Sequence, residues 1–304
     1  MLTIAHLSDV HLGPLPHARL WSLSPKQLTG YANWHRGRKH RHLAAVLELI
    51  VGDIADAKAD HIAVTGDLCN IGLKAEISEG LKWLERLGSP EHVTVVPGNH
   101  DAYVRLPDTH GVALWAAYMS GATPHGVVRR GEPVPFPFVR RLGPLAIVGL
   151  SSAVPTPMFR ATGRLGSAQR EGARQVLGEL GREGLVRVVL IHHPPLPGLA
   201  DRPRRLIDAR AFSEVLRDTG AELVLHGHNH RAELAYAETV AGRLPVVGVA
   251  SASIGRHPRD DRGRYNLYRI EPRPGARPRI TMTGRAVTED LARVETVDER
   301  VILE

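Results

Sequence analysis

The chain has 304 residues, of which 43% are hydrophobic and 23% charged, and its formal net charge at pH 7 is +7. This composition is typical of a globular domain and excludes a disordered chain, while a single cysteine excludes a disulfide scaffold and a thiolate zinc cluster. No apolar run approaches the roughly 18 residues of a membrane-spanning helix, and the N-terminus lacks the basic start of a secretion signal. We therefore expect a cytoplasmic protein.

Two features of the composition point toward ligands. The positive charge is carried almost entirely by arginine, with only five lysines among 39 basic residues. Arginine pairs with two phosphate oxygens at once, although a bias in the base composition of the genome explains the excess equally well. The chain also holds 17 histidines, and neutral histidine is the commonest metal ligand among side chains.

Short apolar runs alternate with helical patterns along the chain, which predicts an α/β fold. The predicted strands cover 2–7, 61–65, 92–96, 145–150, 187–191, 222–225, 245–249, 265–270 and 279–283. The predicted helices cover 41–58, 75–87, 167–180 and 208–219. The last three strands follow one another without a long helix, so we expect antiparallel strands within 245–285.

Two long segments interrupt this alternation, at 13–40 and at 103–141. The first exceeds the two to six residues usual for a strand-to-helix loop. We find no internal repeat and no clear linker, and therefore predict a single domain over residues 1–304. The insert at 13–40 leaves the first strand and should cover its carboxyl end as a cap.

Polar residues follow five predicted strands where each strand ends. In open α/β sheets these ends line the ligand crevice. Oxygen and nitrogen ligands without sulfur favour manganese, iron or zinc over calcium. These polar side chains outnumber the ligands of one tetrahedral ion. Two ions that share a bridging carboxylate would use them all, and such a pair of ions is an arrangement that hydrolyses phosphate esters. The candidate ligands are Asp9, His11, Asp67, Asn99, His192, His228 and His230.

The ordered set Asp9-x-His11, Gly66-Asp67, Gly98-Asn99-His100-Asp101, His192 and Gly227-His228-x-His230 resembles the calcineurin-like metallophosphoesterase superfamily. The resemblance implies a four-layer α-β-β-α sandwich with two central mixed β-sheets and a dinuclear metal site at the C-terminal ends of the strands. It implies that Asp67 bridges the two divalent ions, one held also by Asp9, His11 and His230, the other by Asn99, His192 and His228.

The same resemblance implies a mechanism. A hydroxide between the metals would attack phosphorus, and His100 would stabilise the transition state or protonate the leaving oxygen. Asp101 would orient or polarise His100. His193, the second histidine of its pair, would either support the site or face the substrate.

Motif details narrow the expected substrate. The histidine of Asn99-His100-Asp101, with the His192-His193-Pro194-Pro195 segment, is similar to bacterial class III cyclic-nucleotide phosphodiesterases and their glycerophosphodiesterase relatives. We predict a phosphodiesterase acting on a small phosphate ester; the alternatives are a phospholipid-headgroup hydrolase at the membrane surface or a phosphomonoesterase. We expect no specific nucleic acid, because no recognised nucleic-acid module is present, and no scaffold role, because no ligand is missing. The sequence does not indicate an oligomeric state.

The insert carries Trp21, Tyr31 and Trp34, followed by a basic stretch at 35–42. Three interpretations remain open. It could be a packed lid with solvated arginines, or a clamp in which Arg36, Arg38 and Trp34, together with His193, contact the substrate. It could also be a patch, over 13–42, that binds an anionic membrane surface and makes the protein peripheral to the inner membrane face.

Overall fold

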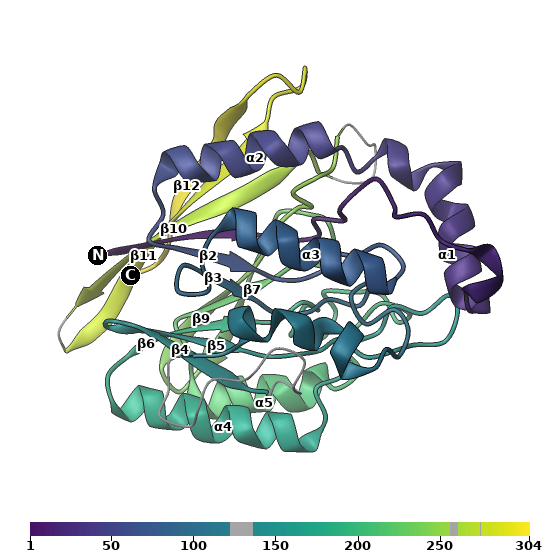
Figure 1. Cartoon of the computed structure of the whole chain (residues 1–304). Helices are drawn as coiled ribbons and strands as arrows, with labels where there is room; N and C mark the ends of the chain where they lie inside the picture. Colours follow the sequence, from purple (N-terminus) through teal and green to yellow (C-terminus); the bar gives the residue numbers. More distant parts are fainter. Residues whose placement is uncertain (122–135, 256–260, 274) are drawn as a thin grey trace.

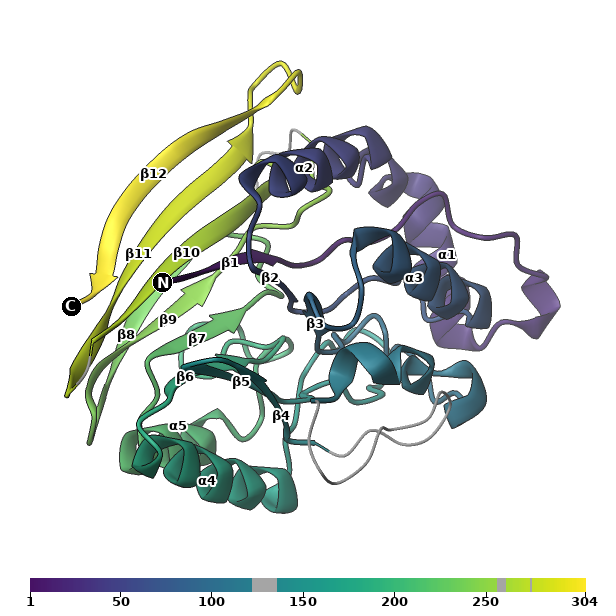
Figure 2. The same ribbon diagram turned by 60° about the vertical axis from the view of Figure 1, so that its left-hand side comes forward.

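The computed structural model describes residues 1–121, 136–255, 261–273 and 275–304. Two β-sheets lie face to face at the centre, and helices cover their outer faces (Figure 1). The predicted α/β sandwich of four layers is therefore confirmed. Figure 2 shows how the strands of both sheets curve together along one side of the molecule.

The first sheet has the strand order β12-β11-β10-β1-β2-β3. Strands β1, β2 and β3 are parallel, and β10, β11 and β12 continue the sheet in antiparallel fashion. Its strands are β1 (Leu2–Leu7), β2 (His61–Val64), β3 (Val93–Val95), β10 (Arg264–Arg273), β11 (Ala276–Val287) and β12 (Val294–Leu303).

The second sheet has the strand order β4-β5-β6-β7-β9-β8. Its four central strands are parallel, and the outer strands β4 and β8 are antiparallel to their neighbours. Its strands are β4 (Phe138–Leu142), β5 (Leu145–Gly149), β6 (Val186–Leu190), β7 (Leu223–His226), β8 (Glu233–Thr239) and β9 (Gly242–Gly248).

Two pairs of helices cover the two sheets. Helices α2 (Ala44–Ala57) and α3 (Lys74–Leu87) lie on the first sheet, and α4 (Ser167–Arg182) and α5 (Ala209–Thr219) lie on the second (Figure 1). Helix α2 buries Val46, Leu47, Ile50 and Ile54, the apolar face that the helical spacing predicts. The parallel central strands are apolar on both faces because each face meets either the other sheet or a helix.

The insert at 13–40 is folded rather than a loop. It contains the 3-10 turn η1 (Leu20–Ser22), helix α1 (Pro25–Arg36) and the 3-10 turn η2 (Arg38–His40). Sequence patterning missed α1 because its apolar residues are few, although Ser24 and Gln27 form the capping box that starts it. The segment at 103–141 includes η3 (Asp108–His110), η4 (Val112–Met119) and β4, while its residues 122–135 lie outside the described part.

One predicted pairing is wrong. The run at 245–249 does not join the antiparallel strands at 265–270 and 279–283, because β9 lies in the second sheet, parallel to β7. Strand β8, whose polar alternation gave no strand prediction, precedes β9 and forms a hairpin with it. Strand β12 was also missed, since half of its side chains are polar and they do not alternate regularly with the apolar ones.

Candidate metal centre

The loops that follow the strands of both sheets meet at one edge. In the first sheet, the backbone amides of Asp9 and His11 donate to the carbonyls of Gly66 and Asp67, both at 2.9 Å. From the second sheet, the amide of His228 donates to Asp9 Oδ2 at 2.9 Å. These hydrogen bonds bring together the loops that carry Asp9, His11, Asp67 and His228.

Five of the predicted ligands have a left-handed backbone conformation. The φ angles of Asp9, His11, Asp67, His228 and His230 lie between +43° and +71°. Side-chain-bearing residues adopt such angles at a cost of about 1–3 kcal/mol each and persist there when the surroundings impose them, often at functional sites. The strain is thus concentrated where carboxylate and imidazole groups must be aimed at one point.

The ligand atoms form two clusters. Asp9, His11 and His230 place one ligand atom each within 4.8 Å of the others, and so do Asp9, Asp67 and His192. The Nε2 of His230 lies 3.1 Å from Asp9 Oδ1. The Nε2 of His192 lies 3.4 Å from Asp67 Oδ2 and 3.1 Å from Asn99 Oδ1.

Asp67 belongs to the second cluster and also approaches the first. Its Oδ2 lies 3.4 Å from the Nε2 of His192 and 3.9 Å from the Nε2 of His11. One carboxylate oxygen thus faces a histidine of each cluster. This position fits the bridging role that the resemblance implies for Asp67.

Three histidines are held so that one ring nitrogen faces the centre. The Nδ1 atoms of His11 and His192 lie 2.9 and 2.6 Å from the carbonyl oxygens of Cys69 and Thr65. The Nε2 of His228 lies 2.8 Å from the carbonyl oxygen of Arg204. A carbonyl only accepts, so each bond fixes the tautomer and leaves the other nitrogen as a ligand.

The donor set fits two divalent cations. In the described residues, the buried Oδ1 of Asp9 receives no well-formed hydrogen bond, and the residue Asp9 belongs to both clusters. Burial would raise the pKa of Asp9, yet the neighbouring His230 holds it below its usual value. An ionised carboxylate and oriented imidazoles are the groups that manganese, iron or zinc bind.

His100 is oriented differently from the expectation. Its Nδ1 is hydrogen-bonded to the carbonyl oxygen of Asn70. The carboxylate of Asp101 instead accepts from the backbone amides of Asp67, Cys69 and Gly98 at 2.8–2.9 Å. The prediction that Asp101 orients His100 directly is therefore corrected, because Asp101 fixes the loops that carry Asp67 and His100.

The residues predicted to contact the substrate lie in different environments. His193 is buried, with its Nδ1 2.8 Å from Ser152 Oγ and its Nε2 3.1 Å from the Ala161 carbonyl oxygen, so it supports the site rather than facing substrate. Trp34 is buried against Gly13. Arg36 is exposed at the end of α1.

Arg38 alone of this group reaches the centre. Its guanidinium lies 2.9 Å from the Nε2 of His11 and 3.2 Å from the Nε2 of His100. Burial lowers the pKa of Arg38, while the carboxylates of Asp67 and Asp9 favour its charged form. The insert therefore places a cation beside the first cluster and beside His100.

Sequence reasoning missed two supporting residues. His42 is buried, its ring meets the ring of His11 edge-on at 4.4 Å between centroids, and its Nδ1 lies 2.8 Å from Ser253 Oγ. Asn70 holds His100 through its backbone carbonyl, which no side-chain pattern could reveal.

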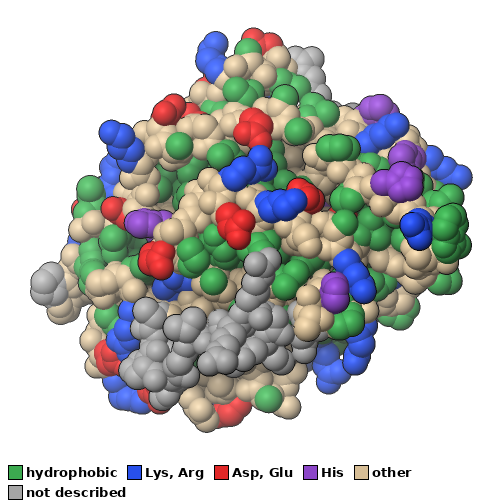
Figure 3. Space-filling model, in the orientation of Figure 1, with side chains coloured by type: hydrophobic (Ala, Val, Ile, Leu, Met, Phe, Trp, Pro, Cys, Tyr) green, Lys and Arg blue, Asp and Glu red, His purple; other side chains and the backbone are tan. Residues whose placement is uncertain are grey.

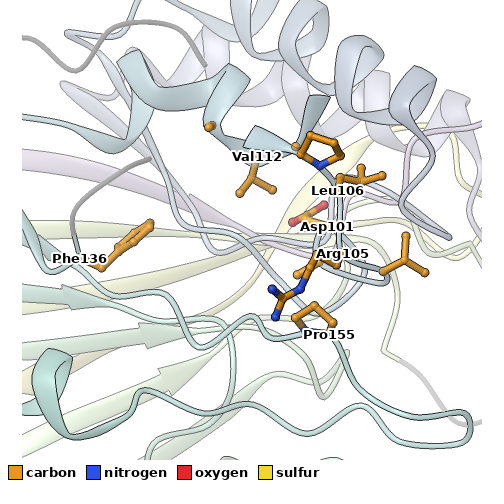
Figure 4. Close-up of a pocket in the computed structure, with 11 residues that line it drawn as sticks. Asp101, Arg105, Leu106, Val112, Phe136 and Pro155 are labelled. Carbon is orange, nitrogen blue, oxygen red and sulfur yellow. The ribbon is translucent and has the colours of Figure 1, made fainter. Parts of the chain in front are cut away.

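A cavity of about 520 Å³ opens beside the loop that follows His100 (Figure 4). Asp101 forms part of its wall, together with Leu106, Val112, Phe136 and Pro155, and Arg105 lies at its side. Most of this lining is apolar. The cavity offers space, beside the loop that follows His100, for an apolar portion of a ligand.

Comparison with known proteins identifies the family of this chain. A model of the calcineurin-like phosphoesterase family matches residues 2–232. The chain belongs to this family. A curated relative, named "probable cyclic nucleotide phosphodiesterase", from Synechococcus sp. is 29% identical over 234 residues, which cover 76% of this chain and 74% of the relative. The protein is thus a metallophosphoesterase, a hydrolase of the dimetal class.

Solved structures show the same fold. A dimetal phosphatase from Danio rerio superposes with a TM-score of 0.62 at 13% identity, over 97% of this phosphoesterase and 98% of that chain. A purple acid phosphatase from yellow lupin superposes with a TM-score of 0.55 at 11% identity, over 99% of this chain and 53% of that one. At such identities the likeness concerns the fold alone.

The glycines of the motifs are positions of close approach between loops. A Cβ on Gly98 would collide with Asp67, and one on Gly227 would collide with Ser8 and Asp9. We therefore expect Gly227→Ala to displace the Asp9 carboxylate and to weaken metal binding about 10- to 100-fold. Isothermal titration of the metal-free phosphoesterase with Mn²⁺ measures this change.

The matched control is Gly52→Ala, since a Cβ at that position on α2 meets nothing within 4 Å. The control should bind Mn²⁺ like the natural protein. Unaltered affinity in Gly227→Ala would contradict the close approach of the two loops.

Proposed function

We propose that the protein is a phosphodiesterase in which two divalent ions and His100 act on one phosphodiester group. The observation that carries the proposal is that Asp67, a member of one ligand cluster, also lies 3.9 Å from His11 of the other, with His100 beside them. The ring of His100 lies 5.0 Å from that of His11, between centroids. A phosphate held by the clusters would therefore meet His100.

The cofactor in this proposal is a pair of manganese, iron or zinc ions, chosen by the mixed oxygen and nitrogen ligands. When bound, such ions lower the pKa of a coordinated water and neutralise charge on phosphoryl oxygens. Asp9, His11 and His230 would hold one ion, Asn99, His192 and His228 the other, and Asp67 both.

His100 has the position of a group that contacts the reacting phosphate. The bond from its Nδ1 to the Asn70 carbonyl turns its Nε2 toward Arg38 and the clusters. Burial, with Arg38 nearby, lowers the pKa of His100 to about 3, so the ring is neutral without a phosphate. An anionic phosphate beside the ring would favour its protonated form, which can hydrogen-bond the leaving oxygen.

Support for a diester substrate comes from the curated relative and from the motif at His100. The relative is named as a cyclic-nucleotide phosphodiesterase. The apolar cavity beside the loop of Asp101 suits an ester with a second organic substituent better than a simple phosphate. Phosphomonoesterase activity is the alternative, since both solved structures named above are phosphatases.

We expect the manganese-loaded protein to hydrolyse bis(p-nitrophenyl) phosphate faster than p-nitrophenyl phosphate. Asp67→Ala should abolish turnover, because it removes the carboxylate that faces both clusters. The absorbance of the released p-nitrophenolate measures both reactions, with metal content determined on the same samples.

His100→Ala is the control for metal binding. It should retain both ions while kcat falls about 10²- to 10⁴-fold, the contribution usual for a positioned acid or base. Preference for the monoester would replace the diesterase proposal with a phosphatase. Turnover that survives Asp67→Ala would remove the metal centre from the mechanism.

We also propose that Arg38 binds the substrate phosphate. Its guanidinium is already beside His11 and His100, and charge-assisted bonds to phosphate are strong. Arg38→Ala should raise KM for the diester about 10- to 100-fold, since such bonds contribute about 1.5–3 kcal/mol. The affinity of this variant for Mn²⁺ should equal or exceed that of the natural protein, because the substitution removes the guanidinium that competes with Mn²⁺ for His11.

Arg36→Ala serves as the matched control for Arg38, since Arg36 is exposed on the same segment. It should leave KM unchanged. An unchanged KM in Arg38→Ala, or a loss of Mn²⁺ binding, would show instead that Arg38 only supports the structure.

A further inference from the structure

Large apolar side chains are exposed on two segments that lie beside each other. Leu20, Trp21 and Leu28 belong to the insert, and Met158 and Phe159 belong to the loop after β5. Trp21 is 83% exposed and Phe159 is 88% exposed. We call these five residues the apolar rim. Scattered exposed apolar residues need no explanation, but a group of this size marks a contact surface.

Both tips of the rim are held by local hydrogen bonds rather than by packing. In the insert, the amides of Ser22 and Leu23 donate to the carbonyls of Arg19 and Leu20, and Leu23 is buried as an anchor. In the other loop, Thr156 Oγ1 donates to the carbonyl of Arg160 at 2.6 Å. The apolar side chains between these bonds therefore project from fixed turns.

The backbone of Phe159 adds a second observation. Its φ is +61°, in the left-handed region that bulky residues rarely adopt. The side chain packs against little, being almost wholly exposed. Strained backbone conformations cluster at functional positions. A strained residue whose side chain packs against little of its own chain is therefore a candidate for contact with another molecule.

The segments that carry the rim are joined to each other and to the loop that carries His100. Lys26 of α1 donates to Thr156 Oγ1 at 3.1 Å and to the carbonyl of Tyr103 at 2.8 Å, which joins the two segments. The ring of Tyr103 stacks on that of His100, 5.5 Å between centroids. Pro155, which lines the apolar cavity, directly precedes this junction. The segments that carry the rim are thus connected to His100 through Lys26 and Tyr103, and to the cavity through Pro155.

The two segments that carry the apolar rim contain basic residues and no acidic ones. Residues 13–41 hold six Lys or Arg and no Asp or Glu, and residues 151–166 hold two Arg and no acid. Arg19 lies 5.9 Å from the ring of Trp21, and Arg160 is exposed next to Phe159. Hydrophobic, basic and histidine side chains gather at the edge that α1 forms (Figure 3).

We propose that the apolar rim inserts among the headgroups of an anionic phospholipid membrane. Exposed tryptophan, phenylalanine and leucine beside basic residues form the combination that binds such surfaces, through apolar burial and attraction to negative lipids together. The metal centre would then face a phosphodiester at the membrane surface. That consequence rests on the proposed diesterase, but the membrane contact itself requires no turnover.

The test uses Trp21 as a natural reporter, because Trp34, Trp83 and Trp115 are buried. The protein is titrated with vesicles of phosphatidylcholine alone and of phosphatidylcholine mixed with phosphatidylglycerol. We expect a blue shift of the emission and co-sedimentation with the mixed vesicles only, both suppressed by high salt. Phe159→Glu should weaken the apparent affinity at least about tenfold.

Val240→Glu is the matched control, since it adds the same charge at an exposed apolar residue in the turn between β8 and β9. It should bind vesicles like the natural protein. No binding to mixed vesicles, equal binding by Phe159→Glu, or burial of Trp21 through self-association without vesicles would each overturn the proposal.

Hydrolysis of bis(p-nitrophenyl) phosphate in solution separates the two proposals. Phe159→Glu should keep this activity, because Phe159 contacts neither the clusters nor His100. If the natural protein hydrolyses the diester but does not bind the mixed vesicles, the membrane proposal alone is overturned. Vesicle binding without any hydrolysis would overturn the diesterase alone and leave the membrane contact standing.

Discussion

The contact between Asp67 and His192 joins the two halves of the fold at the site. Asp67 follows β2 of the first sheet, and His192 follows β6 of the second, yet their side chains lie 3.4 Å apart. The Nδ1 of His192 bonds to the carbonyl of Thr65, which also belongs to the first sheet. The metal centre therefore exists only where the carboxyl edges of both sheets meet. Its geometry depends on the loops that run between them.

Those loops explain the unusual backbone at the site. A left-handed residue turns the chain within one position, so that successive side chains can point at the same place. At Asp9, His11, Asp67, His228 and His230 the turn is made by the ligand itself rather than by glycine. Glycine is kept for Gly98 and Gly227, where neighbouring side chains leave no room for a Cβ. Two requirements therefore constrain the sequence near the ligands: the side chain must be able to bind a metal ion, and the neighbouring glycine must leave room for it.

This division shows what sequence can predict. Strand ends and ligand types were predictable, because an apolar run followed by Asp, Asn or His is a local pattern. The role of Asp101 was not, since its partners are backbone amides of Asp67, Cys69 and Gly98, which come together only in the fold. Strands β8 and β12 escaped detection because each mixes polar with apolar residues, which weakens the pattern by which a strand is recognised. Helix α1 escaped because its start is marked by capping rather than by apolar spacing.

The insert combines features of interpretations that the sequence left separate. Trp34 is packed as in a lid, Arg38 reaches His11 and His100 as in a clamp, and Trp21 remains exposed. One segment can do all three because α1 is anchored by Lys26 and Gln27 to the loops around the centre. Among the described residues no helix is both long and apolar enough to span a bilayer.

The central claim is that these ligands hold two ions that share Asp67. Anomalous diffraction from crystals grown with Mn²⁺ tests it most directly. Our account predicts two anomalous peaks about 3.5–4 Å apart, one beside His11 and His230 and the other beside Asn99 and His192, with Asp67 contacting both and Arg38 displaced from His11. A single peak, or an Arg38 that stays on His11 while Mn²⁺ binds elsewhere, would contradict it.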